Sequence, residues 1–168
     1  MKALFRKGDQ MDSKLFTDYI SRYRNMVYRV AYSYLKTPAD SEDIMQEVFL
    51  KLYQSGKSFD SEEHLKAWLI RVTINKAKDE LKASRRKQTE LISDSADISD
   101  NTNAELHEAI QALSEDHRLV VYLHYYEGYG VREMARLLRI SEANVKTRLK
   151  RARDKLRAFL TDDERSFS

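Results

Sequence analysis

The sequence contains no cysteine, which excludes disulfide bonds, zinc sites built on thiolates and catalysis by a thiol. A chain without cysteine suits a reducing compartment, so we expect a cytoplasmic protein. The sequence also lacks a run of about 18 uncharged apolar residues, which a membrane span needs, and its basic N-terminus lacks the apolar stretch of a secretion signal. We therefore expect a soluble protein with no direct membrane insertion.

Turn residues are scarce as well, with 1 proline and 4 glycines in 168 residues. Many short strands would need more of these residues between them, so helices are expected and a β-sandwich or β-barrel is not. Hydrophobic residues make up 42% of the chain, and 10 tyrosines and 6 phenylalanines are among them. This content is sufficient for packed cores, and the length allows one ordinary domain or two small ones.

Charge divides the chain into two basic blocks around an acidic one. Basic residues outnumber acidic residues by 18 to 13 in residues 1–90 and by 12 to 7 in residues 118–168, whereas residues 91–117 hold 7 acidic residues and no basic residue. Two basic domains on an acidic tether favour a polyanionic partner contacted at two separate places. The alternative is two basic surfaces that are only solvated.

The acidic stretch marks a domain boundary. Residues 92–103 are rich in Ser, Asp and Asn and poor in bulky apolar residues, so they cannot readily bury enough surface to order themselves. We predict an all-α protein with two small helical domains joined by a flexible acidic linker. The predicted parts are a basic N-terminal tail at 1–12, a first domain at 13–87, the linker at 88–103, a second domain at 104–160 and a C-terminal tail at 161–168.

Amphipathic helices are predicted in the first domain. Apolar residues recur every three or four positions from Phe16 to Tyr34, and again from Ile44 to Tyr53, which places them on one face of each helix. Thr37 is the expected N-cap of the second helix, before a proline at its first position. The other face of this second helix carries polar residues that solvation alone would explain, namely Asp40, Asp43, Gln46 and Glu47.

A third helix, after a loop at 57–61, is apolar on more than one side and is expected to pack deeply. The side of this helix that is not apolar carries four cations and one amide at helical spacing, which places them along one line: Arg71, Asn75, Lys78, Lys82 and Arg85. Such a line, about three turns long, fits a phosphate backbone, although stripes of this kind are often only solvated.

A helix-turn-helix is predicted in the second domain. A short helix at 131–138 has the small Ala135 where two helices would cross, Arg139 and Ile140 form a tight turn, and Ser141 caps a final helix. Arginine can bridge two guanine acceptors and asparagine the adenine edge, so the final helix can enter a major groove, although similar helix pairs also serve as plain packing units. Its exposed face carries Asn144, Lys146, Thr147, Arg148, Lys150 and Arg151.

Three segments in this order resemble the extracytoplasmic-function (ECF) sigma factors, a group of the bacterial sigma-70 family of RNA polymerase specificity subunits. Residues 40–53 (DSEDIMQEVFLKLY) are similar to the core-binding helix of region 2, and residues 65–82 (LKAWLIRVTINKAKDELK) to the helix that melts and reads the promoter −10 element. Residues 126–153 are similar to region 4, which reads the −35 element. The resemblance implies promoter-specific transcription initiation with core RNA polymerase, not enzymatic catalysis.

The resemblance also implies roles for individual side chains. The clamp helices of the largest polymerase subunit would bind Asp40, Asp43, Gln46 and Glu47. The loop at 57–61 would receive an unstacked base, and the −10 element would contact Lys57, Phe59, Arg71, Asn75, Lys78 and Lys82. Arg148 is expected to reach base edges best within the set that would bind the −35 element, Ser141, Glu142, Asn144, Lys146, Thr147, Arg148 and Arg151.

The chain departs from the family pattern in the second domain. Arg139 stands where relatives commonly have glycine, and Ala143 with Asn144 replaces a frequent Gly-Thr, so the −35 preference does not transfer. The resemblance further implies an anti-sigma factor as a partner and a tether that occupies the RNA path of the polymerase. It implies no cofactor and no metal.

Two other classes of function compete with this one. An enzyme lacks support because His64, His107, His117 and His124 show no metal spacing with carboxylates, and no glycine-rich phosphate loop is present. A conventional helix-turn-helix regulator that binds duplex DNA without polymerase explains residues 104–160. It leaves residues 13–87 as an unassigned sensor domain.

Overall fold

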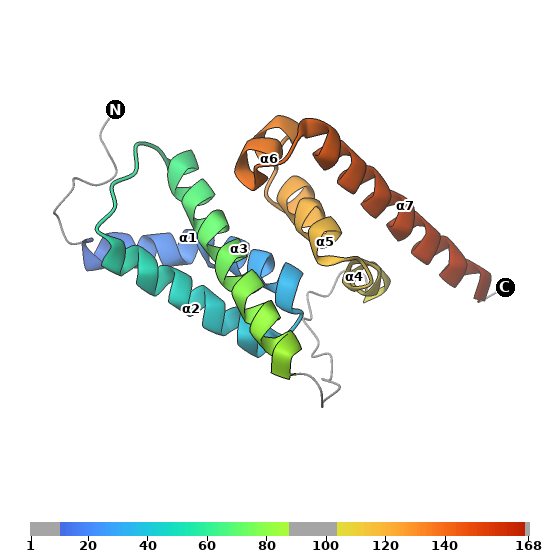
Figure 1. Ribbon diagram of the computed structural model, residues 1–168, viewed down its shortest axis with the longest axis horizontal. Helices are drawn as coiled ribbons and strands as arrows, with labels where there is room; N and C mark the ends of the chain where they lie inside the picture. The colour runs from blue at the N-terminus through green and yellow to red at the C-terminus, as the bar shows by residue number, and fades with distance from the viewer. Residues whose placement is uncertain (1–10, 88–103, 167–168) are drawn as a thin grey trace. The chain divides into compact units, whose positions relative to one another are not determined.

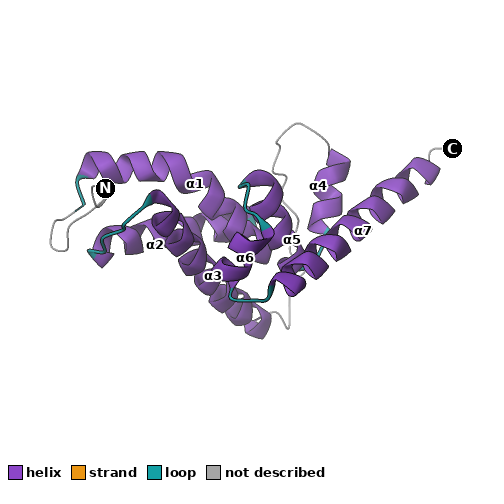
Figure 2. Cartoon of the chain, turned by 90° about the horizontal axis from the view of Figure 1, so that it is seen from above, coloured by secondary structure: helices purple, strands orange, loops and turns teal. Residues whose placement is uncertain are grey.

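Two helical units make up the chain in the computed structural model (Figure 1). The structure describes residues 11–87 and 104–166. Every regular element in these ranges is a helix, and Figure 2 draws no strand there, which confirms the predicted all-α class. The first unit spans Met1–Ser95 and the second Ala96–Ser168, and the predicted linker at 88–103 lies outside the described residues.

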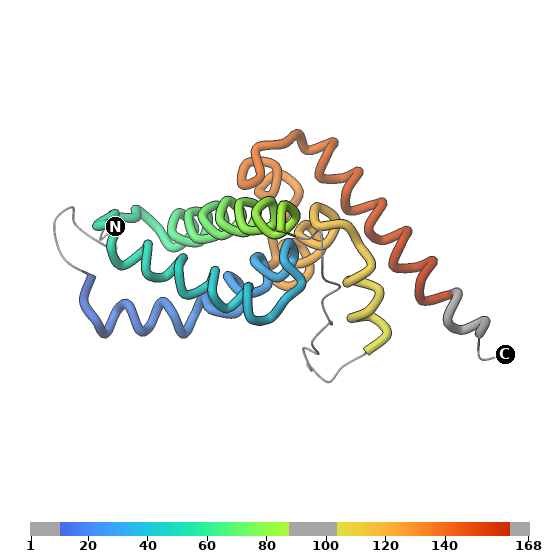
Figure 3. The backbone as a smooth tube through the Cα atoms, turned by 60° about the horizontal axis from the view of Figure 1, so that its bottom comes forward, coloured from blue at the N-terminus to red at the C-terminus, as the bar shows by residue number. Residues whose placement is uncertain are grey.

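Three long helices pack side by side in the first unit, as Figure 3 shows. They are α1 (Ser13–Leu35), α2 (Pro38–Ser55) and α3 (Glu62–Lys87). The burial of each aliphatic side chain stabilises the fold by about 1.5–3 kcal/mol, so the packing of three apolar faces, rather than helix propensity, holds this unit together. Side chains with at most 1% exposure in its core include Val27, Val30, Val48, Leu52, Leu65, Leu69 and Ile70.

Capping groups and backbone conformation define the ends of these helices. The Asp12 carboxylate accepts a hydrogen bond from the Lys14 N–H at 3.2 Å at the start of α1. Thr37 occupies the N-cap position of α2 as predicted, but its hydroxyl donates to the Leu35 carbonyl instead of capping the helix. Gly56 ends α2 with a φ of 57°, a left-handed conformation that glycine adopts without steric cost.

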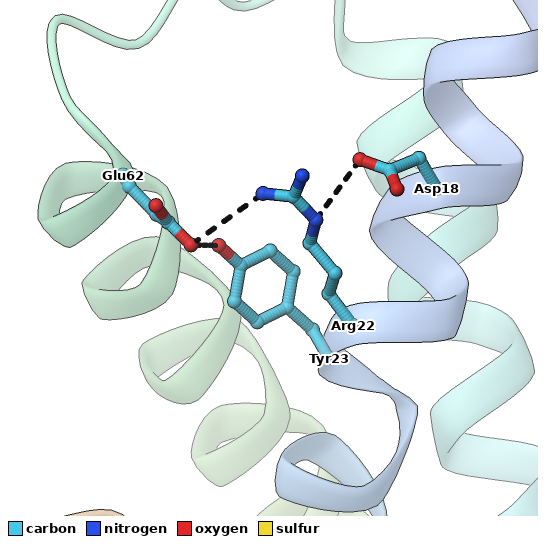
Figure 4. A network of polar contacts seen from close by, with 4 residues as sticks. All are labelled: Asp18, Arg22, Tyr23 and Glu62. Carbon is cyan, nitrogen blue, oxygen red and sulfur yellow. Dashed lines mark hydrogen bonds and ion pairs between the residues drawn. The ribbon is translucent and has the colours of Figure 1, made fainter.

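A polar network joins α1 to the first residue of α3 (Figure 4). The Tyr23 hydroxyl donates to the Glu62 carboxylate, whose Oε1 also lies 3.9 Å from Arg22 Nη1, and Arg22 Nε lies 3.0 Å from Asp18. Burial of the ring and the hydrogen bond to Glu62 raise the pKa of Tyr23 well above its ordinary value, so the phenol stays a donor. The network thus fixes the start of α3, directly after the loop at 57–61.

Residues 104–166, the described part of the second unit, form four α-helices and one π-helical turn. They are α4 (Ala104–Gln111), α5 (Glu115–Val121), η1 (Tyr122–Tyr126), α6 (Val131–Leu138) and α7 (Glu142–Ser166). α5 continues directly into η1, where the Glu127 N–H donates to the Tyr122 carbonyl at 3.2 Å, and Gly128 with a φ of 73° then turns the chain. α6 has the bounds that the sequence predicts, whereas α7 extends to Ser166, beyond the predicted domain end at 160.

A buried arginine links α4 to α5. Arg118 is 1% exposed, and its Nη1 donates to the carbonyls of Gln111 and Leu113 at the C-terminal end of α4. Helix C-termini leave carbonyls without intrahelical partners. Arg118 satisfies that of Gln111, the last residue of α4, and also the carbonyl of Leu113 in the connection to α5. The core beside it includes Leu119, Val120, Leu123, Met134, Val145 and Leu149. Within the described residues, no helix has the length and apolar content to cross a membrane.

Candidate nucleic-acid and protein interfaces

The predicted helix-turn-helix is present in the second unit, with a specific bond at each junction. The Gly130 N–H donates to Glu133 Oε2 at 2.7 Å where α6 begins, and the Ile140 N–H donates to the Ala135 carbonyl at 3.1 Å where it ends. Ser141 caps α7 as predicted, because its Oγ accepts the Asn144 N–H at 3.0 Å. These three hydrogen bonds define where α6 begins, where it ends and where α7 begins.

The turn between α6 and α7 places a non-glycine residue in the left-handed region. Arg139 has a φ of 56°, a conformation that costs a residue with a Cβ roughly 1–2 kcal/mol. The family's common glycine would avoid this cost, so the chain keeps the turn geometry in spite of the substitution. α7 therefore starts directly after its predicted cap, Ser141.

Most of the side chains assigned to the −35 element are exposed on the first turns of α7. Ser141, Asn144, Lys146, Thr147 and Arg151 lie open to solvent. Glu142 is exposed too, with an oxygen 3.4 Å from Arg132 Nε on α6. This face carries hydroxyl, amide and cationic groups, while Val145, Leu149 and Ala152 turn inward, as predicted.

Arg148 differs from the expectation that it would reach base edges best. Its side chain is only 22% exposed, and its Nη2 lies 3.2 Å from Asp116 Oδ2 on α5. Its Nε donates to Asn144 Oδ1 at 3.0 Å, one turn earlier on α7. Burial, and then the nearby Lys155, lower the pKa of His117, so this histidine adds no charge beside the pair at neutral pH. Arg148 therefore lies against α5 instead of projecting freely.

The polar line on α3 is exposed over most of its length. Asn75, Lys78 and Lys82 are exposed, and Lys78 Nζ lies 5.9 Å from the ring centroid of Tyr34. Arg71 is half-buried at the start of the line. The ammonium group of Lys78 thus lies over an aromatic ring, and because the side chain is also exposed, the charge stays available to a polyanion.

The loop at 57–61 requires a correction to the predicted DNA-contact set. The Phe59 side chain is 1% exposed, and its ring packs edge-on against Trp68 at 5.7 Å and His64 at 5.4 Å between centroids. A ring enclosed in this way cannot stack on a base, so Phe59 anchors the loop rather than contacting DNA. Lys57 is exposed, with its Nζ 5.8 Å from the Trp68 ring centroid.

The exposed face of α2 combines acidic and apolar side chains. Asp43 and Gln46 are exposed, Asp40 is half-buried, and Glu47 Oε2 lies 2.7 Å from Lys76 Nζ on α3. Two large apolar side chains extend this face toward the C-terminal end of the helix, Leu50 at 53% exposure and Tyr53 at 44%. The prediction that Tyr53 broadens the buried stripe was wrong, although its ring contacts Phe16 at 5.1 Å.

Comparison with protein-family models identifies both units. Sigma-70 region 2 matches residues 19–87, and Sigma-70 region 4 matches residues 103–156. The chain belongs to the ECF group of the sigma-70 family. Its function is therefore promoter-specific initiation of transcription with RNA polymerase. Among the described residues, no group of three or more metal-binding side chains comes together.

Curated relatives of this ECF sigma factor match it along nearly its whole length. It is 27% identical to the ECF RNA polymerase sigma factor SigW of Bacillus subtilis over 177 residues, which covers 94% of this chain and 93% of that protein. It is 28% identical to the ECF RNA polymerase sigma-E factor of Escherichia coli over 169 residues, covering 89% and 86%. These relatives are initiation factors that act with a polymerase, not catalysts themselves.

Solved structures share the fold. The sigma factor RpoE from Bartonella quintana, solved with the anti-sigma factor NepR, matches with a TM-score of 0.73 at 21% identity, over 88% of this chain and 98% of that one. CnrH, solved with the cytosolic domain of CnrY, matches with a TM-score of 0.65 at 25% identity, over 90% and 91%.

Sequence reasoning missed two kinds of functional candidate in this sigma factor. Leu50 and Tyr53 were missed because both are apolar and lie next to the buried stripe of α2, so periodicity alone assigns such positions to the core. Asp116 was missed because its contact with Arg148 joins residues 32 positions apart. A signal for Leu50 existed, since it lies seven residues after Asp43, on the same face of an α-helix.

Proposed function

We propose that this sigma factor binds the clamp helices of the largest polymerase subunit through α2, reads and opens the −10 element with α3 and the loop at 57–61, and reads the −35 element with α7. One observation carries the proposal. Three exposed faces with different chemistry lie on α2, α3 and α7, the first two within the segment that matches sigma-70 region 2 and the third within the segment that matches region 4.

The polymerase-binding surface would combine acidic and apolar contacts on α2. Protein interfaces typically bury a few large side chains at the centre of a polar rim. Leu50 and Tyr53 would supply this apolar centre, and the ion pair between Glu47 and Lys76 would open or be shared when the surfaces meet. Acidic and amide groups at its rim are Asp40, Asp43, Gln46 and Glu47.

The −10 surface would hold the strand that separates from the duplex. Asn75, Lys78 and Lys82 are spaced to follow successive phosphates, and Arg71 would contribute at the start of the line. Lys57 and the half-buried Trp68 form the side of the loop where an unstacked base would lie, since aromatic rings and cations both hold such bases. Phe59 would hold this site in place through its contact with the Trp68 ring.

The −35 surface would be the N-terminal half of α7, since recognition helices contact base edges mainly with their first turns. Ser141 and the helix N-terminus suit a phosphate, and Lys146 and Arg151 suit phosphates or guanine. Asn144 and Thr147 remain as neutral groups for base edges, with Glu142 at the rim of the surface.

An anti-sigma factor is a further proposed partner. RpoE of Bartonella quintana was solved with an anti-sigma factor, and this chain shares its fold. Such a partner would act by covering the surfaces that polymerase and promoter need. The proposal places the sigma factor in the bacterial cytoplasm, where polymerase and chromosome lie.

Run-off transcription with bacterial core polymerase and a genomic promoter library tests the proposal. The full chain should start transcription at discrete sites that core polymerase alone does not use. The rival function, a regulator that binds duplex DNA by itself, predicts tight binding of the pure chain to an operator and no new start sites. That pair of results would reject the proposal.

A further inference from the structure

Three polar side chains from two helices form a chain of contacts behind the exposed face of α7. Asp116 on α5 pairs with Arg148 Nη2 at 3.2 Å, and Arg148 Nε donates to Asn144 Oδ1 at 3.0 Å. The middle member, Arg148, is the most enclosed at 22% exposure, whereas the Asp116 side chain is 50% exposed and Asn144 is open to solvent.

The geometry of arginine makes this chain directional. A guanidinium group is planar and always charged, so two contacts at different nitrogens fix its plane. Asp116 holds one edge of the Arg148 group, which leaves Nε directed at Asn144. The Arg148 side chain is 22% exposed, so its guanidinium group is largely shielded from solvent, while the carboxylate of Asp116 and the amide of Asn144 remain accessible to water.

Arg148 in turn sets the orientation of the Asn144 carboxamide. Only the amide oxygen can accept the Nε–H, so Oδ1 lies toward Arg148 and the NH₂ group lies on the other side. The backbone of Asn144 is held independently by Ser141 Oγ, which accepts its N–H at 3.0 Å. Both the backbone and the side chain of Asn144 are therefore oriented before DNA binds, and preorganised groups lose less entropy on binding.

We propose that Asp116 is a positioning residue for −35 recognition: through Arg148 it orients the Asn144 amide, and so determines the preference at the base pair that Asn144 reads. This inference rests on the proposed function of α7. Arg148 occupies one of the two lone pairs of Oδ1, so the second lone pair and the NH₂ group remain for the adenine edge, and the preference expected at that position is adenine. Asp116 itself does not touch the DNA.

Two simpler roles for Asp116 make different predictions. As an acidic residue in the first turn of α5 it could only stabilise that helix, in which case its loss lowers stability without changing base preference. As a negative charge near DNA it could only weaken binding, in which case its loss tightens binding to all sequences alike. A positioning role alone changes the preference at one base pair.

The experiment uses the full chain with core polymerase and a promoter library randomised across the −35 element, with transcripts counted by sequencing. Asn144→Ala should reduce the preference at one position by about 5- to 150-fold. Asp116→Ala should reduce the preference at that same position by at least about twofold, the lower limit for coupled neighbours. The double variant should resemble Asn144→Ala alone.

A matched control and a second variant separate charge from geometry. Asp154→Ala removes an exposed carboxylate of α7 that pairs with Lys150 at 2.8 Å, and should leave the profile at the Asn144-dependent position unchanged. Arg148→Lys keeps the positive charge but loses the planar guanidinium group that contacts Asp116 and Asn144 at the same time. It should therefore show the same change in base preference as Asp116→Ala.

Three results would overturn the inference. The first is an equal change in base preference at every −35 position in Asp116→Ala. The second is a double variant whose fold-loss of preference is the product of the two single fold-losses. The third is an Asp116→Ala variant with a lowered melting temperature and an unchanged base preference. Failure of the proposed function is a separate result, since the unmodified chain would then show no promoter-specific starts, and the inference would fail with it.

Discussion

The buried Arg118 offers the sharpest test of the packing of the second unit. Arg118→Met keeps an unbranched, flexible stem, although a shorter one, and removes the donor to the carbonyls of Gln111 and Leu113. A buried acceptor left without a partner costs about 1–3 kcal/mol, and the Leu113 carbonyl bears this cost in full because its contact is buried. The Gln111 contact is only partly buried, so water can replace part of it.

The expected loss in the free energy of unfolding is about 2–4 kcal/mol, since removing the buried charge offsets some of the cost. For a unit of this size, the change corresponds to a fall of about 10–30 °C in melting temperature. The only tryptophan, Trp68, lies in the first unit, so its fluorescence reports on that unit, whereas far-ultraviolet circular dichroism reports on both. Arg118→Met should lower one transition seen by circular dichroism and leave the Trp68 fluorescence midpoint in place.

Arg132→Met is the matched control, because the Arg132 side chain is 75% exposed and its loss should cost within about 0.5 kcal/mol. A melting curve for Arg118→Met that coincides with that of the unmodified chain would refute the role assigned to Arg118. An equal shift of the Trp68 midpoint would instead show that the two units do not unfold independently.

Other predictions concern the exposed faces. Asp43→Arg should keep its melting temperature, since surface changes usually cost within about 0.5 kcal/mol, and should lose core-polymerase association in a pull-down; assembly at unchanged affinity would contradict the docking proposal. Lys78→Ala with Lys82→Ala should impair open-complex formation more on duplex than on premelted promoters, and equal defects on both templates would count against it. For single-strand binding, the slope of the logarithm of the binding constant against the logarithm of the salt concentration should fall in size by roughly 0.7 for each phosphate that the variant no longer neutralises. Phe59→Ala should destabilise the first unit by about 3–5 kcal/mol, as measured by the Trp68 fluorescence midpoint, whereas Phe59→Leu should restore most of this loss; a neutral Phe59→Ala would show that the loop needs no anchor.

Helix positions could be predicted from the sequence because the signals are local. The short helix at 131–138 is bounded by glycine on one side and by a turn and a cap on the other, and the structure has the same bounds. The start of α7 depends on Ser141 and the N–H three residues later, a contact that spacing alone specifies. Long apolar stripes such as that of α3 likewise need no knowledge of the partner helix to be recognised.

The exposure of individual side chains could not be predicted in the same way. Phe59 lies in a loop, where no periodicity indicates burial, and only the arrangement of Trp68 and His64 around it shows that it is an anchor. Arg148 is polar and lies at the edge of the exposed face of α7, so its position on the helix does not reveal that α5 supplies a carboxylate there. Each error comes from a contact between separate elements, the loop with α3 for Phe59 and α5 with α7 for Arg148, which helical periodicity does not indicate.

The chemistry of the exposed faces separates the proposed protein contact from the proposed DNA contacts. Large apolar side chains, Leu50 and Tyr53, lie in line with the carboxylates of α2, and aromatic or aliphatic anchors beside polar groups are typical of protein interfaces. The first turns of α7 carry only hydroxyl, amide and charged groups on their exposed face apart from Ala143, and DNA interfaces are polar and rich in positive charge. A carboxylate on α2 would repel a phosphate backbone, so Asp43 and its neighbours are unsuited to DNA and suited to a cationic or apolar protein surface. The division of labour between α2 and α7 therefore follows from the side chains that each helix leaves exposed, independently of the family match.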